Sequence, residues 1–271
     1  MKKDQYAVIG NPIKHSLSPR IHTLFASNTN QVMEYTARLV SVQQLETALT
    51  KLQKEGFKGV SITAPLKVKA YNCVDYYSDR AYLVECINTI RFDEDGRRFG
   101  DNTDGEGLLQ DFQKNLHIHL KDKTILIFGA GGAVRNCLWS LQNAGVKTIT
   151  IANRTLENAE MLCDMMDTDN MQACALTDMP EHSFDIIING TNAHLESEAL
   201  PLTAALFTKD TVYYDFAYGD HAKPALDQAR ALGMQHVHDG LGMLVEQAAL
   251  QFQLWRGVLP DTAIVLSALR S

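Results

Sequence analysis

The stretch "TILIFGAGGAVRNCLWSLQNAGVKTITIANRT", residues 124–155, decides the fold. Its apolar residues 125–128 are typical of a buried strand. A glycine-rich turn follows, and then a predicted helix with apolar residues that include Leu138 and Leu141. A second strand is predicted over residues 148–152. This order of strand, turn, helix and strand predicts a βαβ unit and therefore an α/β protein.

The turn Gly129-Ala130-Gly131-Gly132 has the composition of a dinucleotide-binding loop. Glycines let the backbone approach a pyrophosphate, and the amides and dipole of the following helix face its charge. Val134 occupies the position where that fingerprint usually has a third small residue. The alternative is a tight βα turn that binds no ligand, but the strand before and the helix and strand after favour a cofactor site.

The end of the second strand predicts which dinucleotide binds. An acidic residue there would bond the ribose hydroxyls of NAD, whereas an arginine accommodates the 2′-phosphate of NADP. The chain has Asn153-Arg154-Thr155 and no carboxylate before Glu157. Guanidinium groups suit bidentate contact with phosphate. The sequence therefore predicts NADP as the cofactor.

Composition limits the classes of function. The chain has 271 residues, 45% of them hydrophobic, which is enough for a large core in one long domain or two ordinary ones. The net charge of -7 argues against a nucleic-acid-binding face. Five scattered cysteines without a CxxC pair predict reduced thiols and no metal site. We recognise no signal peptide and no membrane-spanning stretch, so we expect a cytoplasmic protein.

The N-terminal half shows the same alternation of elements. Strands are predicted in "QYAVIG", "VMEYTARLV" and "FKGVSIT". Between the last two, residues 41–56 carry Leu45, Leu49 and Leu52 at helical spacing. Alternation of this kind predicts a largely parallel sheet.

The stretch "GVSITAPLKVKA", residues 59–70, ends a predicted strand at Thr63 and continues through Pro65 to Lys67. Proline lacks an amide proton and interrupts the ladder. The ordinary interpretation is a surface turn with a solvated lysine. Ligands of open α/β sheets, however, bind at the carboxyl ends of the strands, which would place Thr63 and Lys67 beside a ligand.

Several separated motifs resemble the shikimate dehydrogenase family, in the same order and over nearly the whole chain. They are "GNPIKHSLSPRIH" (10–22), "SITAPLK" (61–67), "INT" (87–89), "GDNTDG" (100–105), "GAGGA" (129–133) with "NRT" (153–155), "YDFAY" (214–218) and "DGLGMLVEQAA" (239–249). The resemblance implies an NADP-dependent oxidoreductase that acts on a CH–OH group. The implied reaction interconverts shikimate and 3-dehydroshikimate in aromatic amino acid biosynthesis.

The resemblance also implies a domain organisation. Residues 1–110 would form an α/β substrate-binding domain with a mainly parallel sheet, completed by residues 239–271. Residues 111–238 would form a Rossmann NADP-binding domain. The implied partner is a small hydroxy-acid substrate, without nucleic acid or membrane, and the protein would be a monomer or a homodimer.

Individual residues take roles by the same resemblance. Lys67 and Asp104 would be catalytic. The substrate would be bound by Ser16, Ser18, Thr63, Asn88, Asp104, Tyr218 and Gln247. The cofactor would be bound by Asp79, Gly129, Ala130, Gly131, Gly132, Ala133, Asn153, Arg154, Thr155 and Gly240.

Lys67 and Asp104 are assigned jointly as the proton-transferring pair. Desolvation in a closed cleft would lower the pKa of the lysine, whereas a nearby carboxylate would raise it, so either group can carry the proton. Helix capping is the competing role for Asp104 and for the two serines. Turn hydrogen bonding is the competing role for Thr63 and Asn88, and a polar helix position is the competing role for Gln247.

The chain departs from the family pattern at Ser61, where an asparagine is usual, and at Glu85-Cys86, where a glycine and an alanine are usual. A serine is shorter and leaves space or admits water. We therefore expect low activity on shikimate and partial recovery in Ser61→Asn. The alternatives are a dehydrogenase for a related ligand such as quinate or an aminoshikimate, and a non-catalytic NADP-binding sensor.

Overall fold

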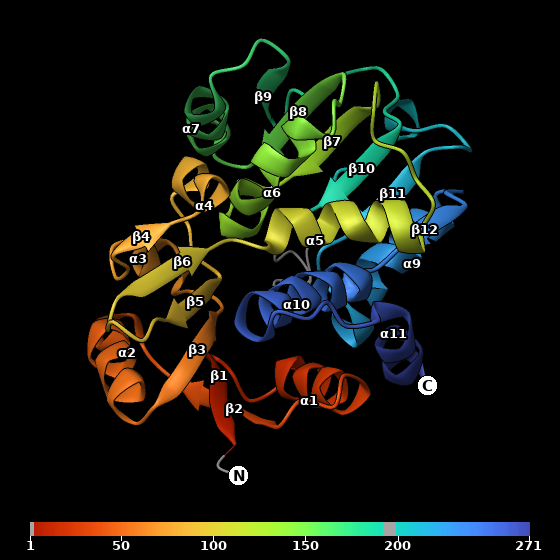
Figure 1. Ribbon diagram of the computed structural model, residues 1–271. Coiled ribbons are helices and arrows are strands. Elements are labelled where there is room, and N and C mark those ends of the chain that lie inside the picture. Colours follow the sequence, from red (N-terminus) through yellow and green to blue (C-terminus); the bar gives the residue numbers. More distant parts are fainter. Residues whose placement is uncertain (1–2, 192–198) are drawn as a thin grey trace. The chain divides into compact units, whose positions relative to one another are not determined.

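The computed structural model describes residues 3–191 and 199–271 and divides into two compact units (Figure 1). The first unit contains Met1–Leu108 and Leu244–Ser271, and the second contains Leu109–Met243. The chain passes between them within α5 (Asp104–Gln110) and again within α10 (Leu241–Arg256). The C-terminal segment therefore returns to the first unit.

The first unit contains a six-stranded sheet in the order β2-β1-β3-β5-β6-β4. β1 pairs in parallel with β2 and β3, and β4 with β6, whereas β5 is antiparallel to β3 and β6. The strands are β1 (Asp4–Gly10), β2 (Met33–Leu39), β3 (Phe57–Ile62), β4 (Tyr76–Tyr77), β5 (Thr89–Phe92) and β6 (Arg98–Asp101). The sheet is mainly parallel, as predicted, with one antiparallel strand in its centre.

The antiparallel strand results from a hairpin that the sequence analysis missed. The amide of Asp93 donates to the carbonyl of Arg97 (2.9 Å), and Gly96 has a φ of 89°. An Asp-Gly pair between two strand-like runs is a strong hairpin signal, because glycine adopts positive φ without steric cost. Residues 95–96 carry that signal.

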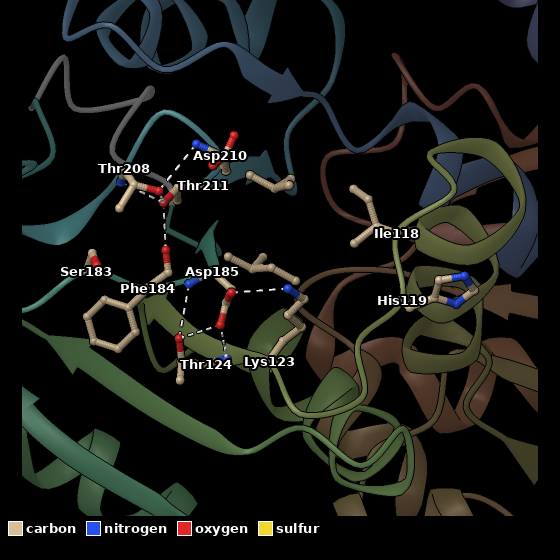
Figure 2. Close-up of a pocket in the computed structure, with 12 residues that line it drawn as sticks. Ile118, His119, Lys123, Thr124, Ser183, Phe184, Asp185, Thr208, Asp210 and Thr211 are labelled. Carbon is tan, nitrogen blue, oxygen red and sulfur yellow. Dashed lines mark hydrogen bonds and ion pairs between the residues drawn. The ribbon is translucent and has the colours of Figure 1, made fainter.

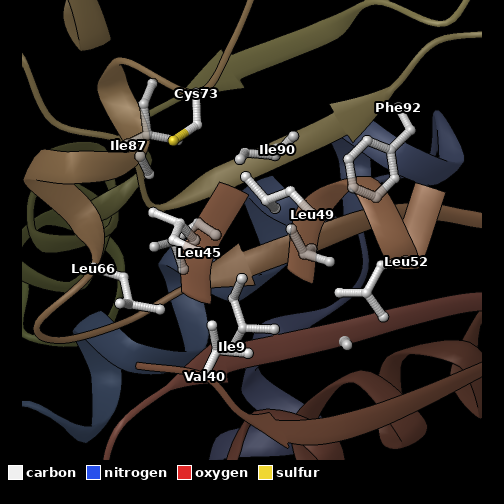
Figure 3. Close-up of a cluster of buried hydrophobic side chains, with 14 of the residues drawn as sticks. Ile9, Val40, Leu45, Leu49, Leu52, Leu66, Cys73, Ile87, Ile90 and Phe92 are labelled. Carbon is white, nitrogen blue, oxygen red and sulfur yellow. The ribbon is translucent and has the colours of Figure 1, made fainter. Parts of the chain in front are cut away.

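The hydrophobic core of the first unit includes the helix that leucine spacing predicted (Figure 3). Leu45, Leu49 and Leu52 are buried on α2 (Leu45–Lys54) and share this core with Ile9 and Ile90 from the sheet. Each such side chain contributes roughly 1.5–3 kcal/mol by leaving water. Apart from α5 and α10, which the unit shares with the second, its other helices are α1 (Ser18–Asn28), α3 (Lys67–Tyr71), α4 (Asp79–Val84), α11 (Thr262–Arg270) and the 3₁₀ turn η1 (Val42–Gln44).

The second unit contains a parallel sheet in the order β12-β11-β10-β7-β8-β9. This is the doubly wound order in which the chain starts in the middle, moves to one edge and then fills the other side. The strands are β7 (Thr124–Phe128), β8 (Thr148–Asn153), β9 (Met171–Ala175), β10 (Ile186–Asn189), β11 (Val212–Asp215) and β12 (His236–His238). The topological switch point lies between β7 and β10, where ligands of such sheets bind.

The second unit has three described α-helices and several shorter helical segments. The α-helices are α6 (Gly132–Asn143), α7 (Leu156–Met166) and α9 (Lys223–Ala231). The shorter segments are the π-helix η2 (Asp111–Asn115) and the 3₁₀ turns η3 (Ala204–Leu206) and η4 (Gly219–His221). Within the described residues, no helix is both long enough and apolar enough to cross a bilayer.

Candidate functional site

Two motifs of the first unit lie against each other where β1 and β3 end. The amide of Asn11 donates to the carbonyl of Ala64 (3.1 Å), and the amide of Thr63 donates to the carbonyl of Ile9 (3.0 Å). A Cβ on Gly10 would lie 2.3 Å from the Cγ2 of Thr63. A glycine is therefore required at position 10. The loop that carries Ser16 and Ser18 (residues 11–18, the serine loop) and the turn that leads to Lys67 (residues 63–67, the lysine turn) start from one place at the carboxyl edge of the sheet.

The serine loop does not cap α1 in the expected way. The amide of Ser18 donates to the Oγ of Ser16 (3.3 Å), but the N-cap residue of α1 is Leu17, which makes no side-chain cap bond. Within residues 3–191 and 199–271, the Ser18 hydroxyl has no hydrogen-bond partner, although Ser18 is buried. This leaves the Ser18 hydroxyl able to bind a ligand.

Lys67 and Asp104 form a close ion pair. Lys67 is the first residue of α3 and Asp104 the first of α5. The Lys67 Nζ lies 2.6 Å from the Asp104 Oδ2, and the two side chains are 23% and 7% exposed. Lys67 is therefore not a solvated turn lysine, because its amine is held by a largely buried carboxylate.

Asn88 connects this ion pair to α10. Its Nδ2 donates to the Asp104 Oδ1 (2.7 Å) and approaches the Gln247 Oε1 (3.4 Å). Its Oδ1 accepts from the amide of Thr103 (2.9 Å). Asn88 is buried, so these bonds fix the orientation of its amide group.

Gln247 is held on both sides of its amide. Its Oε1 accepts from the Nε2 of Gln251 (2.9 Å), and its own Nε2 donates to the carbonyl of Leu244 (2.7 Å). A Cβ on Gly107 would lie 2.7 Å from the amide nitrogen of Gln247, so α5 and α10 touch there through their backbones. Four of the predicted residues, Lys67, Asn88, Asp104 and Gln247, are therefore joined in one cluster.

Ser61 does not leave the vacant space that its short side chain predicts. Its Oγ lies 2.6 Å from the hydroxyl of Tyr35 and donates to the Oε1 of Gln251 (2.6 Å). The sequence analysis missed Tyr35 and Gln251. Gln251 carries a signal, because residues four apart on a helix lie on one face and Gln247 precedes it by four.

Glu85 and Cys86 affect the backbone and the core. Glu85 adopts the left-handed conformation at the end of α4, with φ 44° and ψ 44°, and its side chain is exposed. Cys86 is fully buried, and its carbonyl accepts from the Nδ2 of Asn102 (3.0 Å). The usual family glycine is the residue that this conformation favours.

The glycine turn of the second unit has an exposed, open backbone. Gly129 has a φ of 100°, which requires glycine. α6 begins at Gly132, and its first turn carries no acidic side chain. A Cβ on Gly131 or on Gly132 would meet no atom of the described residues within 4 Å. These residues fit a pyrophosphate, since the backbone is accessible and the helix dipole is unopposed.

The larger side chain of Val134 is accommodated by a glycine, Gly190, on the other side of the contact between helix and strand. It is buried, and a Cβ on Gly190 would lie 2.3 Å from its Cγ2. The third small residue of the fingerprint allows the helix to pack closely on the sheet. Here the glycine after β10 provides that space, so the valine does not disturb the turn.

The end of β8 presents the predicted NADP-selecting residues. Asn153 is the last residue of β8, and its Nδ2 donates to the carbonyl of Thr155 (2.8 Å). Thr155 is the N-cap of α7, and Arg154 between them is exposed. Phe128 pairs with Ala152 in the sheet, so this turn follows a strand adjacent to the glycine turn.

Tyr218 and Gly240 lie on neighbouring segments of the second unit. The amide of Gly240 donates to the carbonyl of Ala217 (2.9 Å), and a Cβ on Gly240 would lie 2.5 Å from the carbonyl oxygen of Phe216. Burial raises the pKa of Tyr218, so its phenol remains protonated. Asp79, the remaining predicted cofactor residue, is the exposed first residue of α4 in the first unit.

Two buried aspartates, each the last residue of a strand, have pKa values that are shifted in opposite directions. Burial raises the pKa of Asp215 in β11 to about 6, despite hydrogen bonds from Asn189 and from the amide of Ala217. Burial also opposes ionisation of Asp101 in β6, but the Arg80 guanidinium outweighs it and lowers the pKa. Arg80 reaches both oxygens of Asp101, at 2.7 and 2.6 Å.

A cavity of about 530 Å³ in the second unit contains none of the predicted site residues (Figure 2). It lies at the amino ends of β7, β10 and β11, where Lys123 pairs with Asp185 (3.2 Å). Asp185 also accepts from the amide and hydroxyl of Thr124 (2.8 and 2.9 Å). Because ligands of this fold bind at the carboxyl ends of the strands, the cavity is on the wrong edge for the cofactor.

Three family descriptions match the chain. Residues 8–90 match "Shikimate dehydrogenase substrate binding domain", residues 111–205 match "Shikimate / quinate 5-dehydrogenase", and residues 240–270 match "Shikimate 5'-dehydrogenase C-terminal domain". The matches cover both units. Together they extend over more than half of the sequence.

Individual relatives are similar over almost their full lengths. A shikimate dehydrogenase (NADP(+)) of Hahella chejuensis is 44% identical over 98% of this chain and 98% of its own. The crystal structure of an Ael1 enzyme from Pseudomonas putida is 41% identical, with a TM-score of 0.92 and 98% of each chain covered. Shikimate 5-dehydrogenase from Thermus thermophilus, solved in complex with NADP(H) and shikimate, is 33% identical, with a TM-score of 0.87 and 98% of each chain covered.

Proposed function

This chain belongs to the shikimate dehydrogenase family, and from that premise we propose that it is an NADP-dependent oxidoreductase that interconverts shikimate and 3-dehydroshikimate. The observation that carries the proposal is the ion pair of Lys67 and Asp104, 2.6 Å apart and joined to Asn88. A binding protein has no need of a largely buried lysine and carboxylate in contact at the carboxyl edge of a sheet. Oxidation of an alcohol needs a group that takes up the hydroxyl proton, and a lysine in contact with a carboxylate can do this.

Oxidation of a secondary alcohol removes the hydroxyl proton and a hydride from the same carbon. Lys67 and Asp104 together would take the hydroxyl proton and return it in the reverse direction. Asn88 holds the Asp104 Oδ1, so the carboxylate presents its Oδ2 to the amine.

NADP, when bound, would supply the nicotinamide that accepts or returns the hydride. Gly129 to Ala133 and the first turn of α6 would hold its pyrophosphate. Asn153, Arg154 and Thr155 would hold the adenosine 2′-phosphate, with the Arg154 guanidinium as the main charge. Asp79 and Gly240 would complete the cofactor site.

The remaining predicted residues would bind the substrate. Ser16 and Ser18 would donate to its carboxylate, and Thr63 and Tyr218 to its ring hydroxyls. Gln247 would donate through its amide. In this proposal residues 1–110 and 239–271 form the substrate-binding domain, and residues 111–238 form the NADP-binding domain.

A cytoplasmic location is part of the same proposal. All five cysteines are free thiols, three of them buried, which suits a reducing compartment. We infer neither a membrane nor a nucleic-acid partner, and we propose a monomer or a homodimer.

A second candidate is a dehydrogenase for a related ring acid such as quinate or an aminoshikimate. The contact of Ser61 with Tyr35 and Gln251 favours this second candidate. Gln251 hydrogen-bonds to Asn88 and Gln247, which would bind the substrate, so an unusual residue at position 61 can change the substrate pocket. A non-catalytic NADP-binding sensor is disfavoured, because it would have no use for the contact of Lys67 with Asp104.

The test is a screen for NADP reduction with shikimate, quinate and related polyols, in which kcat and KM are compared for each. We expect the highest kcat/KM with shikimate. A higher value with quinate would transfer the proposal to the second candidate, and binding of NADP without turnover of any acid would support the sensor.

A further inference from the structure

A continuous set of hydrogen bonds leads from Tyr35 on β2 to Gln247 on α10. The Tyr35 hydroxyl lies 2.6 Å from the Ser61 Oγ, which lies 2.6 Å from the Gln251 Oε1. The Gln251 Nε2 lies 2.9 Å from the Gln247 Oε1. We name Tyr35, Ser61 and Gln251 the relay, and all three are buried.

Fixed acceptors determine the direction of every bond in the relay. The Gln251 Nε2 also donates to the carbonyl of Asn88 (3.3 Å), which can only accept. The Gln251 Oε1 therefore faces Ser61, and the Ser61 hydroxyl must donate its single proton to this oxygen. The Tyr35 hydroxyl is then the donor to Ser61, and reversal of any member would place two acceptors in contact.

Tyr35 is a rigid start for this relay. Its ring stacks on His22, with centroids 4.1 Å apart and planes at 6°. His22 is completely buried, and within residues 3–191 and 199–271 neither of its ring nitrogens has a partner at ordinary hydrogen-bond geometry. Burial lowers its pKa to about 3, against a smaller opposing effect of the Gln251 side chain, so the ring is neutral. Burial also raises the pKa of the Tyr35 phenol, which keeps it a donor throughout the physiological range.

We propose that Tyr35, Ser61 and Gln251 are positioning residues that orient the Gln247 amide so that it offers an N–H to an oxygen lone pair of the substrate. The Gln247 Oε1 receives protons from Gln251 and Asn88, and one Nε2 proton goes to the carbonyl of Leu244. Among the described residues the second Nε2 proton has no acceptor, so it is available to a ligand. The inference rests on the proposed function, because it takes Gln247 as a substrate residue.

The relay also explains the departure at Ser61. A single asparagine has a donor and an acceptor in one side chain. Here the Tyr35 hydroxyl and the Gln251 amide provide both groups around a small serine. Ser61→Asn would place a larger side chain between Tyr35 and Gln251, so we expect it to lower activity, contrary to the recovery expected from the sequence.

The kinetic test uses Tyr35→Phe, which keeps the ring and removes only the hydroxyl. We expect kcat/KM for the best acid substrate to fall about three- to tenfold, and about ten- to a hundredfold in Ser61→Ala, which leaves two buried groups unpaired. The matched control is Thr36→Val, which removes the next hydroxyl along β2, one that has no hydrogen-bond partner in the part of the chain that the structure describes. The control should keep wild-type values.

A double-mutant cycle separates positioning from general destabilisation. If the relay acts through Gln247, Tyr35→Phe should cost activity in the wild type and nothing in a Gln247→Ala background. An equal loss in both backgrounds would overturn the proposal. So would a loss in Thr36→Val as large as that in Tyr35→Phe.

A measurement without turnover keeps the relay testable if the proposed function fails. The side-chain amide of Gln247 is followed by NMR, and its resonances are assigned by their disappearance in Gln247→Ala. Faster hydrogen exchange of this amide in Tyr35→Phe and Ser61→Ala, but not in Thr36→Val, supports the relay. Unchanged exchange in both relay variants refutes it, whereas absence of turnover in the wild type refutes only the proposed function.

Discussion

The two predicted ligand sites are built on different principles. In the first unit the cluster consists of side chains held by one another, and its residues are far apart in sequence; Asn88 and Gln247 are separated by 159 positions. In the second unit the glycine turn offers backbone amides from one short stretch, and no side chain that the structure describes lies within 4 Å of a Cβ at Gly131 or Gly132. The first site therefore depends on tertiary contacts, and the second on local conformation.

If the two sites are separate in this way, substitutions in the first should change turnover and substitutions in the second should change cofactor affinity. The largest effect is expected for Lys67→Ala. Turnover should fall by roughly two to four decades or more, because an acid–base group is removed. KM for the acid should change little, which indicates an interaction made mainly in the transition state. Lys69→Ala, an exposed lysine on the same helix, is the control. Near-normal turnover in Lys67→Ala would contradict a catalytic role for Lys67 and leave it a structural one.

Arg154→Ala tests the second site. We expect NADP affinity to fall roughly ten- to a hundredfold, because a charge-assisted contact with phosphate is lost. Affinity for NAD and kcat at saturating cofactor should not change. Titration of both dinucleotides measures this, with Arg230→Ala, an exposed arginine of the same unit, as control. Equal losses for NADP and NAD would contradict the assignment.

Asp215 and Asp101 should contribute in opposite ways to the pH dependence of the unfolding free energy. The folded pKa of Asp215, about 6, lies above its ordinary 3.8, so its favourable contribution is present below about pH 4 and is lost as pH rises through 6. The folded pKa of Asp101 is lowered, so its contribution is present above about pH 4 and is lost as pH falls further.

Unfolding of wild type, Asp215→Asn and Asp101→Asn between pH 3 and pH 7 measures both effects. Relative to wild type, Asp215→Asn should gain about 3 kcal/mol between pH 4 and pH 7. The deficit of Asp101→Asn should shrink below pH 4. A constant difference for Asp215→Asn across the whole range would show that Asp215 is not the group that titrates.

The smallest effect is expected at two helix ends, one in each unit. Glu85 ends α4 and Asp167 ends α7, both in the left-handed conformation, with φ of 44° and 48°. Glycine relieves the steric cost there, by about 1 kcal/mol or less after the added freedom of the unfolded chain. Because aspartate tolerates this conformation better than glutamate, Glu85→Gly should raise the unfolding free energy more than Asp167→Gly. The reverse order would contradict this reasoning.

The sequence predicted the second unit more completely than the first. The strand, turn and helix of residues 124–155 follow one another in one short stretch, and their pattern alone identifies these elements. The hairpin at residues 95–96 was missed, although its Asp-Gly pair is also local. Gln251 could have been noticed, because it lies one helical turn beyond Gln247. Tyr35 could not be found in this way, because its importance depends on its contact with the Ser61 hydroxyl, and only the folded chain brings the two together.

The contact of Val134 with Gly190 has a consequence for chimaeric proteins. The valine on the helix fills the space beside Gly190, so a substitution at either position has to be matched by one at the other. A transplanted segment 124–155 from a relative with alanine at position 134 would leave a void beside Gly190, whereas a larger residue at 190 alone would collide with the valine. A graft intended to alter the cofactor therefore has to carry residue 190 with it, 35 positions beyond the apparent end of the motif.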